Sequence, residues 1–257
     1  MQSLQKFPRE FAPDTFWLTS CLNISVQGKF LHNHNSCFLI KGDEKTVLID
    51  TAVPFGWQQI KAELRATLGK RTLNYIFVTH PEAPHMGNAE QLLAEYPQAK
   101  LIGDLRNYEL YFPDYQDRFI TKTAGDQIEL GNRDLIFVSA AVHDLQNTLW
   151  CFDTKESILF VSDGYPYTHD HQSQECAMTS EEFLVPPDLN STLVVIQGAL
   201  GWTRHVPPEI TIAKLDAVLQ KYSPKFIAPA HGGVITNPSE ITQIFKAGLK
   251  KVYKEHS

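Results

Sequence analysis

The sequence predicts an α/β fold in which two β-sheets pack face to face and helices cover their outer sides. Short aliphatic runs of strand length recur through all 257 residues, each bounded by polar or turn-forming residues. Stretches with apolar side chains at helical spacing alternate with these runs. Each half of the chain begins with strands and continues with strand and helix in turn, which favours a two-sheet sandwich and one domain over residues 1–257.

The first half contains the clearest helix and turn signals. Residues 56–69 carry apolar side chains at helical spacing from Trp57 to Leu68 and end in a glycine. The polar pair at 42–43 separates two aliphatic runs, which indicates a hairpin. Strands are expected at 22–30, 36–40, 45–49, 75–78 and 100–102, helices at 88–96 and 104–112, and a loop at 113–125.

The second half repeats this order without repeating the sequence. Three aliphatic runs joined by polar turns are followed by strand and helix in alternation, and the closing helix is amphipathic. Strands are expected at 135–140, 148–152, 157–161, 192–196 and 226–228, and helices at 207–222 and 238–253.

Composition excludes several classes of protein. The chain is 43% hydrophobic and 20% charged, and its formal charge of −6 argues against a nucleic-acid partner, because such partners require basic patches. No run approaches the roughly 18 apolar residues of a membrane-spanning helix, and the N-terminus lacks the apolar core of a signal peptide. The four cysteines are far apart and form no CxxC pair, so we expect reduced thiols, a cytoplasmic location and no membrane association.

Potential metal ligands follow one of the predicted strands. Residues 74–88 read NYIFVTHPEAPHMGN, in which an aliphatic strand leads directly to His80, Glu82 and His85. Loops that leave strand ends often carry binding chemistry. Imidazole suits zinc and iron, and a carboxylate favours harder metals, so this segment supplies half of a metal site.

Three later segments place further ligand-type residues just beyond aliphatic strands. These residues are His143, Asp163 and His231. Together with the first three they form six candidates at comparable strand ends, which predicts a joint metal site.

These motifs carry a family resemblance. HxExxH after a strand, a later His, an Asp in ILFVSDGY and a His in FIAPAHG resemble the metallo-β-lactamase superfamily, whose usual motif is HxHxDH. NSCFLI and TVLIDT near the N-terminus resemble the same group, and the resemblance spans residues 16–235. Glu82 in place of the middle His is similar to the flavodiiron and oxygen-binding diiron proteins. The fold that the resemblance implies is an αββα sandwich of two mixed sheets flanked by helices.

The resemblance also implies roles for the six residues. His80, Glu82 and His143 would hold one metal ion, His85 and His231 would hold a second, and Asp163 would bridge the two. The implied cofactors are two metal ions, with iron favoured and zinc or manganese as alternatives. Anionic oxygen ligands suit iron redox cycling, whereas zinc also accepts imidazole and carboxylate.

The chain departs from the family pattern at Pro84, where the family has Asp. Proline offers no donor atom, so either water completes the second metal site or that site is weak or empty. In the hydrolytic relatives this Asp orients the attacking hydroxide. Its replacement therefore counts against an efficient hydrolase.

The function expected is a non-haem diiron protein that binds or reduces O2 or NO. The alternatives are a metal-dependent hydrolase of an ester or phosphodiester, with a bridging hydroxide as nucleophile, and a non-catalytic module. No flavodoxin-like region is expected, so the partners would be a small-molecule ligand and an electron-donor protein. A homodimer is expected by analogy with relatives.

Other residues near these motifs have two interpretations. Asp50, His169, His171 and Tyr165 are candidates to orient the metal ligands. Asp144 is interpreted as a turn carboxylate. His32 and His34 would share one face of a strand and could co-ligate a metal, although solvated loop histidines are the default interpretation. Tyr165, Tyr167 and Trp202 could wall a pocket or be loop aromatics, and Cys151 is expected to be a core thiol.

Overall fold

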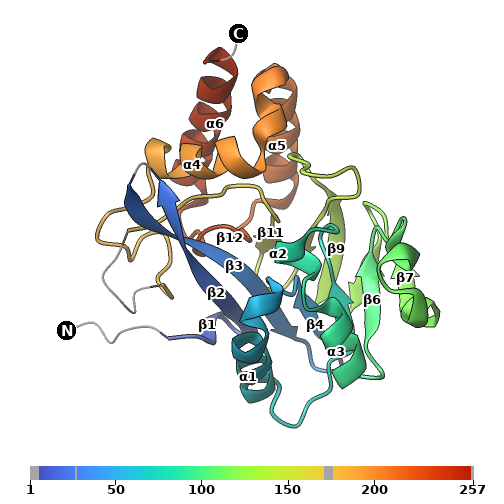
Figure 1. The fold of residues 1–257 in the computed structure, drawn as a ribbon. Coiled ribbons are helices and arrows are strands. Elements are labelled where there is room, and N and C mark those ends of the chain that lie inside the picture. The colour runs from blue at the N-terminus through green and yellow to red at the C-terminus, as the bar shows by residue number, and fades with distance from the viewer. Residues whose placement is uncertain (1–5, 27, 171–175, 256–257) are drawn as a thin grey trace.

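A computed structural model describes residues 6–26, 28–170 and 176–255 of the chain. Among these residues, twelve strands form two sheets that pack against each other, with helices on both outer sides (Figure 1). The predicted α/β sandwich is therefore confirmed. The strands are β1 (Arg9–Ala12), β2 (Thr15–Val26), β3 (Lys29–Lys41), β4 (Thr46–Ile49), β5 (Tyr75–Phe77), β6 (Lys100–Gly103), β7 (Phe119–Thr121), β8 (Gln127–Glu129), β9 (Asp134–Ser139), β10 (Leu149–Asp153), β11 (Ile158–Phe160) and β12 (Phe226–Ala228).

The first sheet has the order β1-β2-β3-β4-β5-β6-β7. Its first four strands are antiparallel, and the long β2–β3 ladder runs from the pair Thr15–Ile40 to the pair Val26–Lys29. From β4 onward the strands pair in parallel, so their carboxyl ends meet at one edge. The second sheet has the order β12-β11-β10-β9-β8, in which only β11 and β12 pair in parallel.

The helices cover the sandwich in two groups. α1 packs Ile60 and Leu64 against the outer face of the first sheet, and α6 packs Phe245 and Leu249 against the second (Figure 1). A third apolar layer, which includes Cys151, lies between the two sheets. The helices are α1 (Trp57–Leu68), α2 (Ala83–Met86), α3 (Ala89–Glu95), α4 (Leu189–Ala199), α5 (Pro208–Tyr222) and α6 (Pro238–Lys254), with short 3-10 helices at Pro54–Gly56, Tyr108–Leu110, Pro113–Arg118 and Gly201–His205.

Several element predictions were wrong. Residues 192–196, predicted as a strand, lie in α4, because Asp188 and Ser191 form a capping box that starts a helix before the β-branched run. Residues 22–30 span two strands, since the β2–β3 hairpin turns at Gly28 with a φ of 80°. The predicted helix at 104–112 is reduced to a single 3-10 turn. Three short edge strands, β1, β7 and β8, were not predicted.

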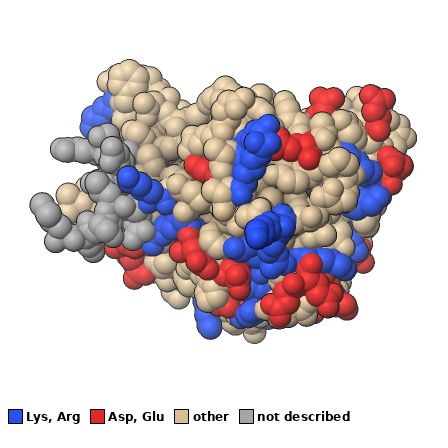
Figure 2. Space-filling view, turned by 90° about the horizontal axis from the view of Figure 1, so that it is seen from below, with Lys and Arg blue, Asp and Glu red and all other residues tan. Residues whose placement is uncertain are grey.

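The surface features are those of a mixed-charge protein. Figure 2 shows Lys and Arg side chains interspersed with Asp and Glu on one face of the molecule. Lys61 and Arg65 on α1 both pair with Glu95 on α3. Within the described residues, every helix is too short or too polar to cross a bilayer.

Glu63 is a buried acid on the sheet-facing side of α1. It accepts hydrogen bonds from Gln59 Nε2 at 2.8 Å and from the backbone N–H of Thr19 at 3.3 Å. Burial outweighs these bonds and raises the pKa of Glu63 to about 7. The folded protein therefore holds this proton more tightly than the unfolded chain does.

This raised pKa predicts a loss of stability as the pH rises from acidic to neutral values. The stabilisation from the Glu63 proton is complete below about pH 4.5, the ordinary value, and is lost as the pH rises through about 7. We expect the loss to be roughly 2 kcal/mol of unfolding free energy between pH 5 and pH 8, and Glu63→Gln to abolish it. Urea unfolding at both pH values measures the difference, with Glu90→Gln on the exposed face of α3 as the control. An equal pH effect in all three proteins would contradict this assignment.

Candidate metal centre

The predicted site residues lie on loops at one end of the sandwich, where strands of both sheets terminate. His80 follows β5, His85 lies on α2, and Asp163 and His231 follow β11 and β12. Two backbone hydrogen bonds join the sheets here: the N–H of Leu149 donates to Thr79 at 2.9 Å, and that of Ser36 donates to Ala230 at 3.0 Å. The sandwich therefore brings together segments that are far apart in sequence.

Asp163 is the central group of this cluster. One of its carboxylate oxygens lies 3.3 Å from His85 Nε2 and 3.0 Å from His231 Nε2, and the other lies 3.3 Å from His80 Nε2. Asp163 is 3% exposed, and His80 and His85 are fully buried. A single carboxylate thus lies beside three imidazoles with both of its oxygens, a position from which it could bridge two metal ions.

The charges of this cluster are strongly coupled. Burial opposes ionisation of Asp163, but the charges of His85 and His231 beside it hold its pKa well below the usual range. Burial likewise opposes protonation of His85, but the carboxylates of Asp163 and Asp50 raise its pKa well above the usual value. The carboxylates therefore require positive charge beside them.

Two further carboxylates lie beside His80. Its Nε2 atom is 3.9 Å from an oxygen of Glu82 and 3.9 Å from an oxygen of Asp144. Burial, followed by the charges of Asp163 and Glu82, raises the pKa of Asp144 to about 7. The interpretation of Asp144 as a turn carboxylate was wrong, because its side chain belongs to this group of ligand-type atoms.

The group of ligand-type atoms beside His80 includes Asp144 but not the adjacent His143. The two residues are adjacent on the loop between β9 and β10, but the close group beside His80 contains Asp144 and Glu82. Burial and the charge of Lys214 lower the pKa of His143. The sequence assigned the histidine to the site because it follows a predicted strand and matches the family resemblance, whereas the loop conformation brings the carboxylate to it.

A set of buried polar residues orients the ligand-type side chains. Asp50 accepts a hydrogen bond from His85 Nδ1 at 2.8 Å, a contact through which it would orient this imidazole. Thr79 donates to Asp50 through its backbone N–H at 2.8 Å, and its hydroxyl lies 2.9 Å from that of Ser162. The Ser162 hydroxyl lies 3.1 Å from His80 Nδ1. Sequence reasoning missed Thr79 and Ser162, although each directly precedes a predicted ligand.

Backbone strain is concentrated in this region. Asp50 and Ser162 have positive φ angles of 58° and 50°, although neither is glycine. Non-glycine residues adopt this conformation only where surrounding contacts enforce it, commonly at functional sites. After β12, Gly232 and Gly233 pack so closely on Tyr167 that a Cβ atom would lie 2.9 Å or less from its side chain. These constraints fix the loops that carry the ligand-type residues.

The residues present fit a metal centre. The Nε2 atoms of His80 and His85 are buried and lie near carboxylate oxygens, yet they form no well-directed hydrogen bond within the described chain. Imidazole nitrogens and carboxylate oxygens in this arrangement suit iron, zinc or manganese. Pro84 lies within α2 and contributes no donor, so His85, His231 and Asp163 are the side chains available on that side.

The other predicted orienting residues lie elsewhere. Tyr165 does not reach the metal ligands, because its ring stacks on Phe245 at 4.8 Å and its hydroxyl lies 3.0 Å from that of Thr242. His169 contacts His32 and His34 instead, and the interpretation of these two as solvated loop histidines was wrong because both lie on β3. His171 lies outside the described residues.

Two depressions lead toward the cluster. A broad one of about 640 Å³ is lined by Asp144, His143, Arg106 and Trp202, so Trp202 does wall a pocket. A smaller one of about 260 Å³ reaches His231. Its wall is mainly apolar and includes Leu22, Ile24, Val194, Val195 and Ala199.

Comparisons with known sequences identify the family of this chain and several relatives. The family described as "Metallo-beta-lactamase superfamily" matches residues 33–197. An anaerobic nitric oxide reductase flavorubredoxin of Pectobacterium atrosepticum is 28% identical over 224 residues, 83% of this chain and 41% of the relative. A coenzyme F420H(2) oxidase of Methanocaldococcus jannaschii is 22% identical over 224 residues, 82% of this chain and 52% of the relative. The chain thus spans about half the length of these relatives or less.

Solved structures show the same fold. A fragment, residues 1–254, of a putative diflavin flavoprotein A 5 from Nostoc has a TM-score of 0.75 at 18% identity, covering 96% of each chain. The rubredoxin oxygen:oxidoreductase of Desulfovibrio gigas has a TM-score of 0.72 at 15% identity, covering 96% of this chain and 61% of that one. The expected αββα architecture is therefore confirmed.

The positions of Asp144 and His143 lead to a direct test. We expect Asp144→Asn to lower the metal content by about one ion per chain, because the variant loses an anionic ligand beside His80 and Glu82. His143→Asn should retain the metal content. Elemental analysis of both variants, purified side by side, measures the difference. The reverse pattern would show that the loop rearranges on metal binding and would restore His143 as the ligand.

Proposed function

This chain belongs to the metallo-beta-lactamase superfamily, and from that premise we propose that it is a non-haem diiron protein that binds or reduces O2 or NO. The proposal depends on one observation above all. Three carboxylates, from Glu82, Asp144 and Asp163, gather around buried imidazoles at the strand ends. Anionic oxygen ligands favour iron over an all-histidine zinc site.

We assign the ligands from the contacts. His80, Glu82 and Asp144 would hold one iron, with Asp144 in the place first assigned to His143. His85 and His231 would hold the other iron, and Asp163 would bridge both. Bound iron would supply the electron exchange with O2 or NO.

The remaining residues of the site orient and shield it. Asp50 and Ser162 fix the imidazole planes of His85 and His80 through their Nδ1 atoms. The pocket at His231, whose wall includes Val194 and Val195, has room for a small uncharged ligand. Pro84 would leave a position open beside the second iron, which suits ligand binding.

The hydrolase alternative has less support. Pro84 replaces the carboxylate that orients hydroxide in hydrolytic relatives. The curated relatives compared above are named as oxidases and reductases. Reduction of either diatomic ligand consumes electrons, so we propose an electron-donor protein as a partner.

Metal analysis and spectroscopy test this function. We expect protein purified anaerobically without chelator to contain about two irons per chain, as two-metal sites of this kind do. Its absorption spectrum should change on exposure to O2 or NO. Zinc in place of iron, with no spectral response and with turnover of phosphodiester or ester substrates, would contradict the proposal in favour of a hydrolase.

The apolar pocket provides a second, independent prediction. Gly198 on α4 lines this pocket, and a Cβ added there would meet no atom within 4 Å. Gly198→Leu should therefore fill the pocket without disturbing the fold. We expect it to slow the reaction of the reduced protein with O2 roughly tenfold, equivalent to about 1.4 kcal/mol of added barrier. Stopped-flow absorption measures this rate.

Gly198→Ala serves as the matched control, because it changes the same backbone position and leaves most of the pocket open. Both variants should retain the iron content of the unmodified protein. An unchanged O2 rate in Gly198→Leu would exclude this pocket as the route of entry while leaving the diiron assignment intact.

A further inference from the structure

A second cluster of ligand-type side chains lies apart from the carboxylate centre. Cys21, His32, His169 and Cys176 each offer one ligand atom, and these four atoms all lie within 4.8 Å of one another. Cys21 Sγ is 3.3 Å from His32 Nδ1 and 3.8 Å from His169 Nε2, and Cys176 Sγ is 3.7 Å from His32 Nδ1. His169 is buried and the other three are partly buried.

These separations match those of a tetrahedral metal site. Zinc binds cysteine sulfur at about 2.3 Å and histidine nitrogen at about 2.0–2.1 Å, so its four ligands lie about 3.3–3.8 Å apart. The three sulfur–nitrogen distances in the cluster fall within this range. Little movement is therefore needed for the four side chains to enclose an ion.

Backbone hydrogen bonds hold the segments that carry the four residues next to one another. Cys21 and His32 lie on the paired strands β2 and β3. His32 and His169 exchange two backbone hydrogen bonds of 2.8 and 3.0 Å, which form an isolated bridge. His34 Nε2 donates to the backbone carbonyl of Cys176 at 2.7 Å.

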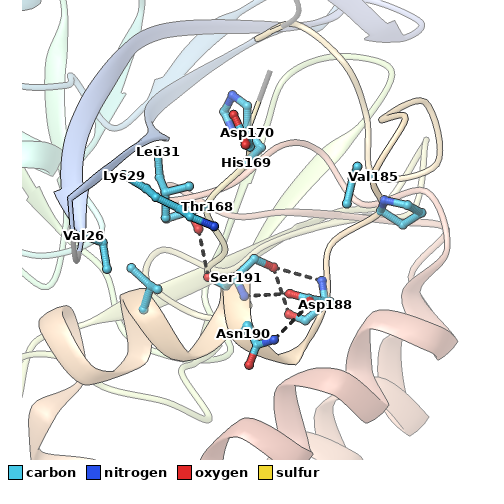
Figure 3. Close-up of a pocket in the computed structure, with 12 residues that line it drawn as sticks. Val26, Lys29, Leu31, Thr168, His169, Asp170, Val185, Asp188, Asn190 and Ser191 are labelled. Carbon is cyan, nitrogen blue, oxygen red and sulfur yellow. Dashed lines mark hydrogen bonds between the residues drawn. The ribbon is translucent and has the colours of Figure 1, made fainter. Parts of the chain in front are cut away.

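The segment that carries His169 is also fixed from its other side. The backbone N–H of Thr168 donates to the carbonyl of Ser191 at 3.1 Å, and the Thr168 hydroxyl donates to the same oxygen at 3.3 Å (Figure 3). Figure 3 also shows a pocket on this side, with His169 and Leu31 in its wall. The cluster therefore joins three segments, each with its own backbone support.

We propose that Cys21, His32, His169 and Cys176 form a structural zinc site, separate from the diiron centre. Two sulfurs and two imidazole nitrogens form a ligand set that selects zinc, whereas the carboxylates of the first centre favour iron. The set is complete without water, as in structural rather than catalytic sites. Among the described residues, no disulfide joins these cysteines.

The zinc ion would clamp the β2–β3 hairpin to the chain around residues 169 and 176. His34 follows His32 on the same strand, β3. Its backbone carbonyl accepts a hydrogen bond of 2.9 Å from Nδ1 of His231, which belongs to the carboxylate centre. The imidazole of His34 meanwhile holds Cys176. The clamp therefore supports the strand that orients one ligand of the first site.

Cobalt substitution and thiol labelling test the site. We expect chelator-treated, reduced protein to bind Co²⁺ with the intense near-ultraviolet charge-transfer band of thiolate ligation. The band should persist in Asp163→Ala, which disables the carboxylate centre, and disappear in Cys176→Ser. Added Zn²⁺ should displace the cobalt and abolish the band.

Thiol labelling gives a measurement that needs no variant. Cys37 and Cys151 are buried in the core, whereas Cys21 and Cys176 are partly exposed. Alkylation followed by mass spectrometry should modify Cys21 and Cys176 in chelated protein and neither of them after one equivalent of Zn²⁺. Absence of the thiolate band in the unmodified protein, equal labelling with and without zinc, or a Cys21–Cys176 disulfide that re-forms in place of metal binding would each overturn the proposal.

Discussion

The contact between the buried carboxylate of Asp163 and three imidazoles is the interaction on which the site depends. An ionised carboxylate with 3% exposure costs several kcal/mol unless positive charge or hydrogen bonds compensate it. His85 and His231 lie 3.3 and 3.0 Å from one of its oxygens. Asp50 on the far side of His85 adds a second carboxylate at 2.8 Å. The cluster therefore carries excess negative charge and is stable only with a proton or a cation at its centre.

The groups that meet this requirement come from both sheets. His80 and Asp50 belong to loops of the first sheet, whereas Asp163 and His231 belong to loops of the second. The compensating groups can meet only if the two sheets keep a fixed offset. The apolar layer between the sheets, together with the Leu149–Thr79 backbone hydrogen bond, provides this offset. The packing of apolar side chains between the sheets thus sets the distances between the ligand-type residues at the edge of the sandwich.

Most of the fold could be predicted from the sequence because the patterns that mark strands and helices lie within short segments of the chain. Aliphatic runs of three to six residues marked the central strands, and the amphipathic spacing of α6 marked the closing helix. The errors occurred where local signals conflicted. At residues 192–196 a β-branched run suggested a strand, but the capping box at Asp188 decided for a helix. The edge strands were too short and too polar to carry a periodic signal. That residues 1–257 form one domain stays a prediction.

For the site, sequence located the loops but not every side chain that faces inward. Asp144 and His143 are adjacent and both are plausible ligands, so only the loop conformation distinguishes them. Thr79 and Ser162 orient ligands through contacts across 29 and 83 positions, which no short motif records. The Cys21 cluster escaped notice for the same reason, since Cys21 lies 148 positions from His169 and His32 lies 144 from Cys176.

Strand β3 connects the two clusters and assigns them different roles. His32 faces the sulfur-containing cluster, and the carbonyl of His34 orients His231 at the carboxylate cluster. Thiolates and imidazoles fix an ion firmly and leave no open position, whereas the carboxylate cluster meets an apolar pocket at His231. A site of the proposed kind, which binds and releases a small ligand, benefits from metal-binding side chains that cannot shift, because misplacement weakens both orientation and reactivity. The rigid cysteine–histidine cluster at His32 therefore complements the open pocket beside the carboxylate cluster.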